Sequence, residues 1–111
     1  MSAAKRTGIV RDPRYADHCT GPGCPECSDR VAVLYAMLQE PDMRGNFQDI
    51  APRRAEKEEL LLVHSPEYIR CLEDTQGRDC TYLDPDTQAS SFSHEAALLA
   101  AGGLCRAIEL V

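Results

Sequence analysis

Apolar residues recur at helical spacing through the last part of the sequence, residues 92–111. They form two rows along one predicted helix, and only a narrow polar stripe separates the rows. The first row contains Phe92, Ala96, Leu99, Gly103 and Ala107. The second row contains Ala97, Ala101, Leu104, Ile108 and Val111. Because a helix that is apolar on most sides is typical of the interior of a larger protein, we expect this sequence to stop within a fold.

The preceding pattern alternates between strand and helix. Residues 7–11 carry a short strand signal, and residues 46–50 carry a second, weaker one. A helix with a single apolar stripe joins them, beginning near Ser28 and ending before Pro41, because proline interrupts a helix. Two strands joined by a helix pair in parallel through a right-handed crossover. We therefore predict a single incomplete α/β domain over residues 1–111, mostly helical with two short strands.

Two later helices have clear start signals. Ser65 is a predicted N-cap, Pro66 occupies the first helical position, and Glu67 places a negative charge in the first turn. Ser93 is the predicted N-cap of the apolar helix, and Glu95 lies in its first turn, where the helix dipole favours an acidic residue.

A turn precedes the apolar helix, built from Asp84, Pro85 and Asp86. Aspartates in such turns commonly hydrogen-bond the backbone of their own turn. The functional alternative is a pair of carboxylates that accept hydrogen bonds from the amides of a substrate. The spacing alone does not decide between these two interpretations.

Composition and charge narrow the class of protein. The formal net charge of −6 argues against nucleic acid or an anionic membrane as the main partner, since both require a basic surface. No apolar run reaches the ~18 residues of a membrane span, and the first residues do not resemble a secretion signal. We therefore expect a cytoplasmic protein whose six cysteines are reduced thiols.

One cysteine spacing suggests a different function, because Cys19, Cys24 and Cys27 follow a C-x4-C-x2-C pattern around a Gly-Pro-Gly turn. Three thiolates at these intervals are typical of part of an iron–sulfur or zinc site. The fourth ligand would come from Cys71, Cys80, Cys105 or, for zinc, His18. The competing interpretation is that Cys27 is a small hydrophobic residue of the neighbouring helix. A small metal-binding module therefore remains the alternative function.

Four segments carry motifs that occur together in one known family. They are residues 7–30, 52–72, 83–87 and 93–103. In this order and at these intervals they resemble the N-terminal third of the histone deacetylase family, in the branch with bacterial acetoin-utilisation proteins and acetylpolyamine amidohydrolases.

The first segment matches the family's His-Pro-Glu-Arg-Pro-x-Arg motif incompletely. Cys24 stands for the histidine of the motif and Cys27 for its first arginine. The positions that match the family in this segment are His18, Pro25, Glu26 and Arg30. The second segment keeps a His-Ser-x-Glu-Tyr-Ile motif at residues 64–69. At the positions of these two cysteines the loop departs from the family motif.

The resemblance implies a fold and an activity. The fold is the N-terminal portion of an open, parallel-sheet, arginase/deacetylase-like three-layer sandwich. The activity is zinc-dependent hydrolysis of acetyl-lysine or acetylpolyamine amides. The sequence contains neither the His-His pair nor the Asp-x-His ligands of the family. We therefore expect no cofactor in this chain and no catalysis by it alone.

The resemblance also assigns a role to the turn aspartates. The family has an aspartate at the rim of its active site, and the Asp-x-Asp-Thr pattern makes Asp86 the better candidate than Asp84. In the complete enzyme this residue would bind the substrate. The apolar rows of the last helix further predict self-association or a missing C-terminal part as the partner of this chain.

Overall fold

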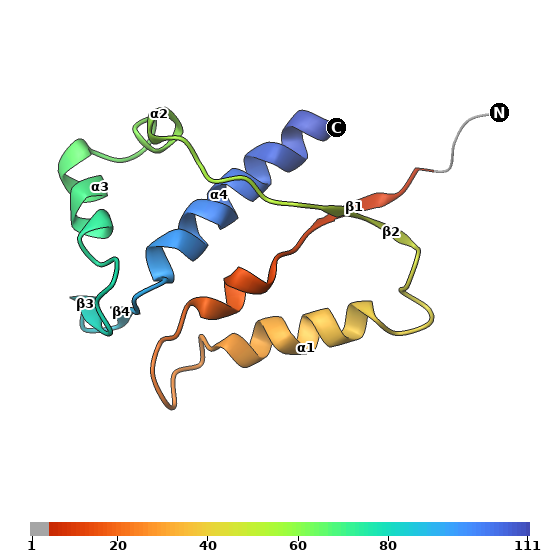
Figure 1. Ribbon diagram of the computed structural model, residues 1–111, viewed down its shortest axis with the longest axis horizontal. Helices are drawn as coiled ribbons and strands as arrows, with labels where there is room; N and C mark the ends of the chain where they lie inside the picture. The colour runs from red at the N-terminus through yellow and green to blue at the C-terminus, as the bar shows by residue number, and fades with distance from the viewer. Residues whose placement is uncertain (1–4) are drawn as a thin grey trace.

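The computed structural model describes residues 5–111 (Figure 1). The prediction that the first residues are not a secretion signal rests partly on residues 1–4, which lie outside this range. The elements, in chain order, are β1 (Thr7–Val10), the 3-10 helix η1 (Pro13–Asp17), α1 (Ser28–Leu38), β2 (Phe47–Ile50), α2 (Lys57–Leu60), α3 (Pro66–Glu73), β3 (Thr81–Asp84), β4 (Thr87–Ala89) and α4 (Ser93–Leu110).

The predicted parallel pair of strands is confirmed. β1 and β2 pair in parallel, in a register that sets Thr7 opposite Phe47 and Val10 opposite Ile50. Just beyond β1, the Arg11 guanidinium makes two hydrogen bonds to the Asp49 carboxylate, at 2.5 and 3.0 Å. This ion pair holds the two strands together where β1 ends.

The helices α1 and α3 form where the sequence predicts them. α1 ends at Leu38, ahead of Pro41. The Ser65 hydroxyl accepts a hydrogen bond from the Tyr68 amide at 3.1 Å, which confirms Ser65 as the N-cap of α3. Ile69 is the residue of α3 that is fully buried.

β3 and β4 form an antiparallel hairpin, of which the sequence pattern predicts only the turn. Asp84 and Thr87 are paired across a loop consisting of Pro85 and Asp86. Proline fixes φ near −65°, so this loop lacks the left-handed conformation of regular two-residue hairpins. The pairing is accordingly irregular between Tyr82 and Asp84. The fold is therefore α/β as predicted, but residues 5–111 contain two strands more than predicted.

The middle of one predicted apolar row of α4, at Ala96, Leu99 and Gly103, is buried, whereas Phe92 at its start is 61% exposed. α4 packs against η1, β1 and β2, and Leu99 is only 1% exposed there. The Tyr15 hydroxyl of η1 donates a hydrogen bond to the Leu99 carbonyl at 2.8 Å. The second row faces outward: Leu104 is 64% exposed and Ile108 is 67% exposed. The second apolar row of α4 is therefore uncovered within residues 5–111.

The start of α4 differs from the prediction by one residue. Phe92 occupies the N-cap position, and Ser93 is the first helical residue. The Ser93 hydroxyl accepts a hydrogen bond from the Ser90 amide at 2.7 Å, so it stabilises the turn before the helix. Ser93 therefore does not cap α4 with its side chain.

The segment between β2 and α2 crosses α4 at very short range. The Ala55 amide donates to the Leu98 carbonyl at 2.9 Å, which joins the two backbones. A Cβ atom at Gly102 would overlap the Arg53 carbonyl oxygen and lie 2.5 Å from the Ala55 nitrogen. Only glycine permits this approach, so Gly102 sets the distance between the segment and the helix.

Ion pairs fasten the same crossing. Arg53 makes hydrogen bonds of 2.8 Å to both carboxylate oxygens of Glu59 and to one of Glu109 in α4. Arg54 pairs with Glu95 at 2.5 Å. The two arginines thus attach the segment to both ends of α4.

Acid should weaken this crossing. The hydrogen bonds from Arg53, and a further one from the Glu56 amide, lower the pKa of Glu59 from 4.5 to about 2. A carboxylate with a depressed pKa contributes stability above about pH 4.5, and that contribution is lost as the pH falls towards 2. Melting temperatures measured from pH 6 to pH 2 should therefore fall more for the wild-type chain than for Glu59→Gln. Equal falls would show that Glu59 does not contribute.

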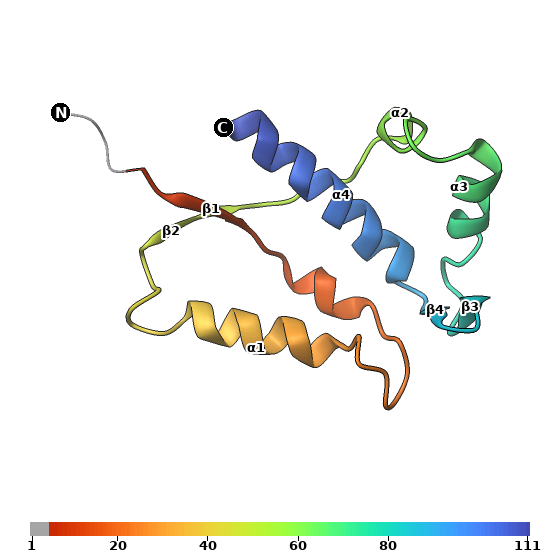
Figure 2. The ribbon, with the colours of Figure 1, turned by 180° about the vertical axis from the view of Figure 1, so that it is seen from behind.

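The core is small for a chain of this length. Within residues 5–111 the largest fully buried side chains are Ile69 and Leu99. The radius of gyration is 16.2 Å, whereas a compact domain of this size would have about 13 Å. Figure 2, seen from behind, shows β1 and η1 lying between α4 and α1, with the β3–β4 hairpin to one side. Within the described part of the chain, no helix has the length and apolar character needed to cross a membrane.

Candidate active-site entrance

The loop from residue 18 to residue 27 joins η1 to α1 and forms one side of a pocket. Gly21 and Gly23 have φ values of +91° and +79°, a conformation that glycine adopts without strain. The Thr20 hydroxyl donates a hydrogen bond to the Glu26 carbonyl across the base of the loop. The loop therefore has a defined shape, which the two glycines permit and Thr20 holds.

A hydrogen-bond network ties this loop to the turn before α4. His18 Nδ1 lies 2.6 Å from Ser93 Oγ, and His18 Nε2 lies 3.2 Å from Glu26 Oε1. The Cys19 amide donates to Ser90 Oγ at 3.1 Å. Ser90 Oγ and Ser93 Oγ lie 3.0 Å apart. His18, matched to the family by sequence, therefore connects two segments that are 75 residues apart.

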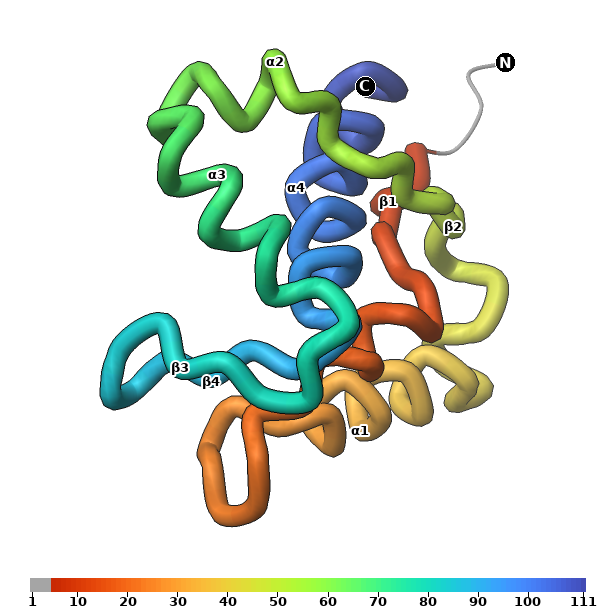
Figure 3. Tube along the Cα trace, turned by 60° about the vertical axis from the view of Figure 1, so that its left-hand side comes forward, coloured from red at the N-terminus to blue at the C-terminus, as the bar shows by residue number. Residues whose placement is uncertain are grey.

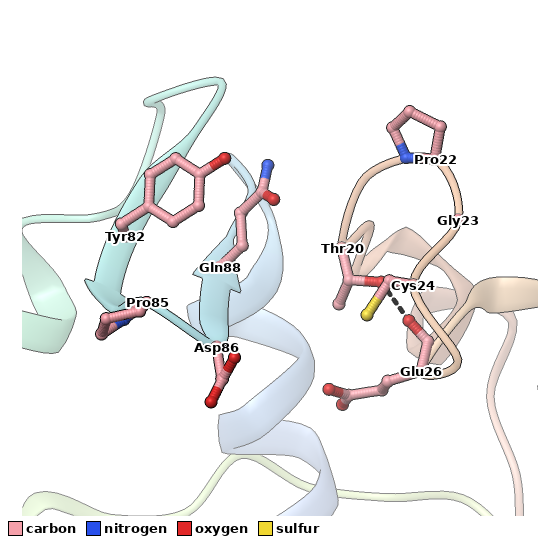
Figure 4. A pocket seen from close by; sticks show the side chains of 9 residues that line it. All are labelled: Thr20, Pro22, Gly23, Cys24, Glu26, Tyr82, Pro85, Asp86 and Gln88. Carbon is pink, nitrogen blue, oxygen red and sulfur yellow. Dashed lines mark hydrogen bonds between the residues drawn. The ribbon is translucent and has the colours of Figure 1, made fainter.

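The loop and the β3–β4 hairpin face each other across a pocket of about 320 Å³ (Figure 4). The pocket is lined by Thr20, Pro22, Gly23, Cys24 and Glu26 from the loop and by Tyr82, Pro85, Asp86 and Gln88 from the hairpin. The two sides approach closely at Gly21, where a Cβ atom would lie 3.1 Å from Gln88 Oε1. The pocket thus depends on both segments.

The structure gives the two turn aspartates different roles. Asp84 Oδ1 accepts a hydrogen bond from the Asp86 amide at 2.8 Å, so Asp84 stabilises the turn. Asp86 lines the pocket. Among residues 5–111, no hydrogen bond or ion pair reaches the Asp86 carboxylate. Asp86 is therefore available to a ligand, and Asp84 is occupied by the backbone.

The pocket carries negative charge on both sides. Glu26 lies on the loop and Asp86 on the hairpin. In Figure 4 their carboxylates lie on opposite walls of the pocket, both towards its lower end. The lining contains no lysine, arginine or histidine. A ligand with a positive charge would complement this lining.

The cysteines predicted as a metal site are not assembled into one. Cys24 lines the pocket, Cys27 is the N-cap residue of α1, and the Cys19 side chain is exposed. Residues 5–111 contain no group of three or more His, Cys, Asp or Glu side chains arranged to hold a metal ion. A hydrogen bond to Glu59 and burial raise the pKa of Cys105, which disfavours the thiolate that a metal requires.

Several pocket residues were not predicted from the sequence. Tyr82 and Gln88 lie on β3 and β4, and Thr20 supports the opposite loop. Tyr82 and Gln88 are register partners across the hairpin. Because the two strands have only four and three residues and are mostly exposed, the sequence carried no usable signal for them.

Comparison with known proteins identifies the family. The model described as "Histone deacetylase domain" matches residues 24–111. A probable deacetylase of Archaeoglobus fulgidus is 36% identical over 110 residues, covering 95% of this chain and 30% of the relative. The polyamine deacetylase HDAC10 of Rattus norvegicus is 32% identical over 98 residues, covering 78% of this chain and 16% of the relative.

A solved structure agrees with these matches. The crystal structure of the HDA15 HD domain aligns with a TM-score of 0.82 and 30% sequence identity, over 89% of this chain and 30% of that chain. The chain spans about a third or less of the length of the curated relatives named here. The match over residues 24–111 covers most of the sequence, and on this ground the chain belongs to the histone deacetylase family.

Proposed function

We propose that this chain forms the N-terminal part of a zinc-dependent deacetylase that hydrolyses the acetyl-amide bond of an acetylated lysine or polyamine. In this proposal the loop at residues 18–27 and the β3–β4 hairpin form the substrate entrance. The chain alone is catalytically silent. We expect the protein to be cytoplasmic.

The position and charge of the pocket carry the proposal. The loop follows β1 and η1, so the pocket lies on the carboxyl side of β1, where open α/β sheets bind ligands. Glu26 and Asp86 give the pocket a negative lining. Polyamines and lysine-rich peptides are cationic, so this lining supports a substrate whose amine groups are positively charged.

The residues of this chain do not fit a zinc ion by themselves, because residues 5–111 bring no three ligating side chains together. The zinc in the proposal would be held by residues that this sequence does not contain. The part assigned to this chain is therefore binding and orientation of the substrate.

A chimera tests the proposal. This chain would be joined, in one polypeptide, to the part of the Archaeoglobus fulgidus relative that lies beyond its matched segment. The chimera should release acetate from N-acetylspermidine and from an acetyl-lysine peptide. Its kcat/KM for acetylspermidine should exceed that for the neutral analogue N-acetylbutylamine by about tenfold at low salt, with a smaller ratio at high salt.

Two controls test the deacetylase function and the catalytic silence of this chain separately. The 111-residue chain with added zinc should release no acetate, and turnover by it would contradict catalytic silence. A chimera with a native-like circular dichroism spectrum but no turnover, beside an active intact relative, would contradict the deacetylase function.

A further inference from the structure

His18 uses its two ring nitrogens to bond two different segments. Nδ1 lies 2.6 Å from Ser93 Oγ at the start of α4, and Nε2 lies 3.2 Å from Glu26 Oε1 on the entrance loop. Figure 3 shows the loop before α1 and the β3–β4 hairpin projecting on the same side of the molecule, next to the start of α4. In a neutral imidazole one ring nitrogen donates a hydrogen bond and the other accepts one. The two partners of His18 therefore decide which nitrogen carries the proton.

The carboxylate of Glu26 settles this choice. A carboxylate only accepts hydrogen bonds, so an unprotonated Nε2 would face it at 3.2 Å with no proton between the two acceptors. With the proton on Nε2, the ring donates to Glu26, and Nδ1 accepts the hydroxyl proton of Ser93. The Ser93 oxygen still accepts the Ser90 amide at 2.7 Å. The Ser93 hydroxyl is then fully bonded, as a side chain that is only 8% exposed requires.

Glu26 is the side chain that this arrangement orients. Its carbonyl accepts the Thr20 hydroxyl and its carboxylate accepts His18 Nε2, so both ends of the residue are held. Among residues 5–111 no other hydrogen bond or ion pair reaches this carboxylate, and the side chain is 65% exposed. Its second oxygen is therefore free for a ligand in the pocket. A carboxylate that is ordered before binding lowers the entropic cost of binding.

We infer that His18, with its proton on Nε2, is a positioning residue for substrate binding. It orders the Glu26 carboxylate in advance, and that carboxylate then binds an ammonium group of the substrate. His18 acts through Glu26 and touches no reacting atom. This role rests on the proposed function, which supplies the cationic substrate, but it can be measured without turnover.

The position of the proton is measured by NMR spectroscopy on the 111-residue chain, labelled with a nitrogen isotope. Long-range proton–nitrogen correlation spectra at about pH 8, where an ordinary histidine is neutral, report the protonation of each ring nitrogen. The signals of His18 are those that disappear in His18→Asn. We expect a protonated Nε2 and an unprotonated Nδ1. The opposite tautomer would overturn the inference, because His18 would then offer Glu26 no donor.

Two variants of His18 separate ligand binding from stability. The side-chain amide of asparagine reaches the place of Nδ1, and that of the longer glutamine reaches the place of Nε2. His18→Asn should therefore keep the bond to Ser93 and release Glu26, whereas His18→Gln should do the reverse. In NMR titrations at low salt, the Kd for N-acetylspermidine should rise by about two- to tenfold in His18→Asn and by less than about twofold in His18→Gln. Urea unfolding should give the opposite order, with His18→Gln the less stable variant, because it leaves the buried Ser93 hydroxyl without its acceptor.

Control variants and a neutral ligand complete the test. His64→Asn changes an exposed histidine outside the pocket and should leave the Kd unchanged. Once Glu26→Gln has removed the charge, adding His18→Asn should not weaken binding further. Three results would overturn the inference: equal losses of affinity in His18→Asn and His18→Gln, losses that follow stability, or a parent chain that binds neutral N-acetylbutylamine as tightly as N-acetylspermidine. A deacetylase chimera without turnover would contradict the proposed function but not this role of His18.

Discussion

Gly102→Ala should destabilise this chain more than the addition of a methyl group at any other position of α4. The new Cβ would overlap the Arg53 carbonyl and approach the Ala55 amide. The segment cannot move away without losing the Ala55–Leu98 hydrogen bond and the Arg53 ion pairs. Overpacking typically costs 1–3 kcal/mol, and a backbone clash belongs at the upper end, so we expect about 3 kcal/mol or more. Urea unfolding followed by circular dichroism measures it.

Variants at two neighbouring positions provide a comparison for the loss of stability in Gly102→Ala. A Cβ at Gly103 would meet side chains, Val10 Cγ1 at 2.7 Å and the Tyr15 hydroxyl at 2.9 Å, which can adjust in part. Gly103→Ala should therefore cost less than Gly102→Ala. Ala101→Gly, on the exposed face, should cost only about 1 kcal/mol through helix propensity. A Gly102→Ala chain as stable as the wild type would show that the crossing is not closely packed.

The sequence was sufficient for elements that are determined locally. Ser65 and Pro66 define the start of α3 through an N-cap hydrogen bond and a fixed φ, and both act within one turn. Pro41 similarly accounts for the end of α1. The strands of the β3–β4 hairpin were missed because they are short and mostly exposed, so burial left no alternation to read.

Tertiary packing decided what the sequence left open in α4. Both apolar rows have the same helical spacing, yet only the row with Leu99 meets η1 and the sheet. Gly102 belongs to neither apolar row, yet it is buried at the crossing with the segment before α2. A helical pattern gives the angle between faces but does not identify the neighbour of each face.

The candidate site was predictable only in part for the same reason. The turn at Asp84 and Asp86 was recognised, but the geometry was needed to separate the turn-forming carboxylate from the one that lines the pocket. The spacing of Cys19, Cys24 and Cys27 suggested a metal site because sequence intervals carry no information about side-chain direction. In the folded loop, Cys27 is instead the N-cap residue that precedes α1.

Asp86→Asn should lower kcat/KM of the deacetylase chimera on a cationic substrate, under the proposed function, by about 10- to 150-fold. The reason is that the Asp86 carboxylate lines the pocket without a partner among residues 5–111, so it can form a charge-assisted hydrogen bond to the substrate. Such bonds contribute roughly 1.5–3 kcal/mol, which corresponds to that range. Steady-state kinetics on acetylspermidine measures the effect.

Asp84→Asn is the matched control, because it removes the same charge two residues away. An asparagine side-chain oxygen can still accept the hydrogen bond from the Asp86 amide, so the turn should persist. Its kcat/KM should therefore stay within about threefold of the parent, the small loss reflecting a weakened field at the pocket. On neutral N-acetylbutylamine, Asp86→Asn should have a smaller effect than on acetylspermidine. Equal losses of kcat/KM in the two variants, or a larger loss in Asp84→Asn, would show that Asp86 is not the residue that contacts the substrate.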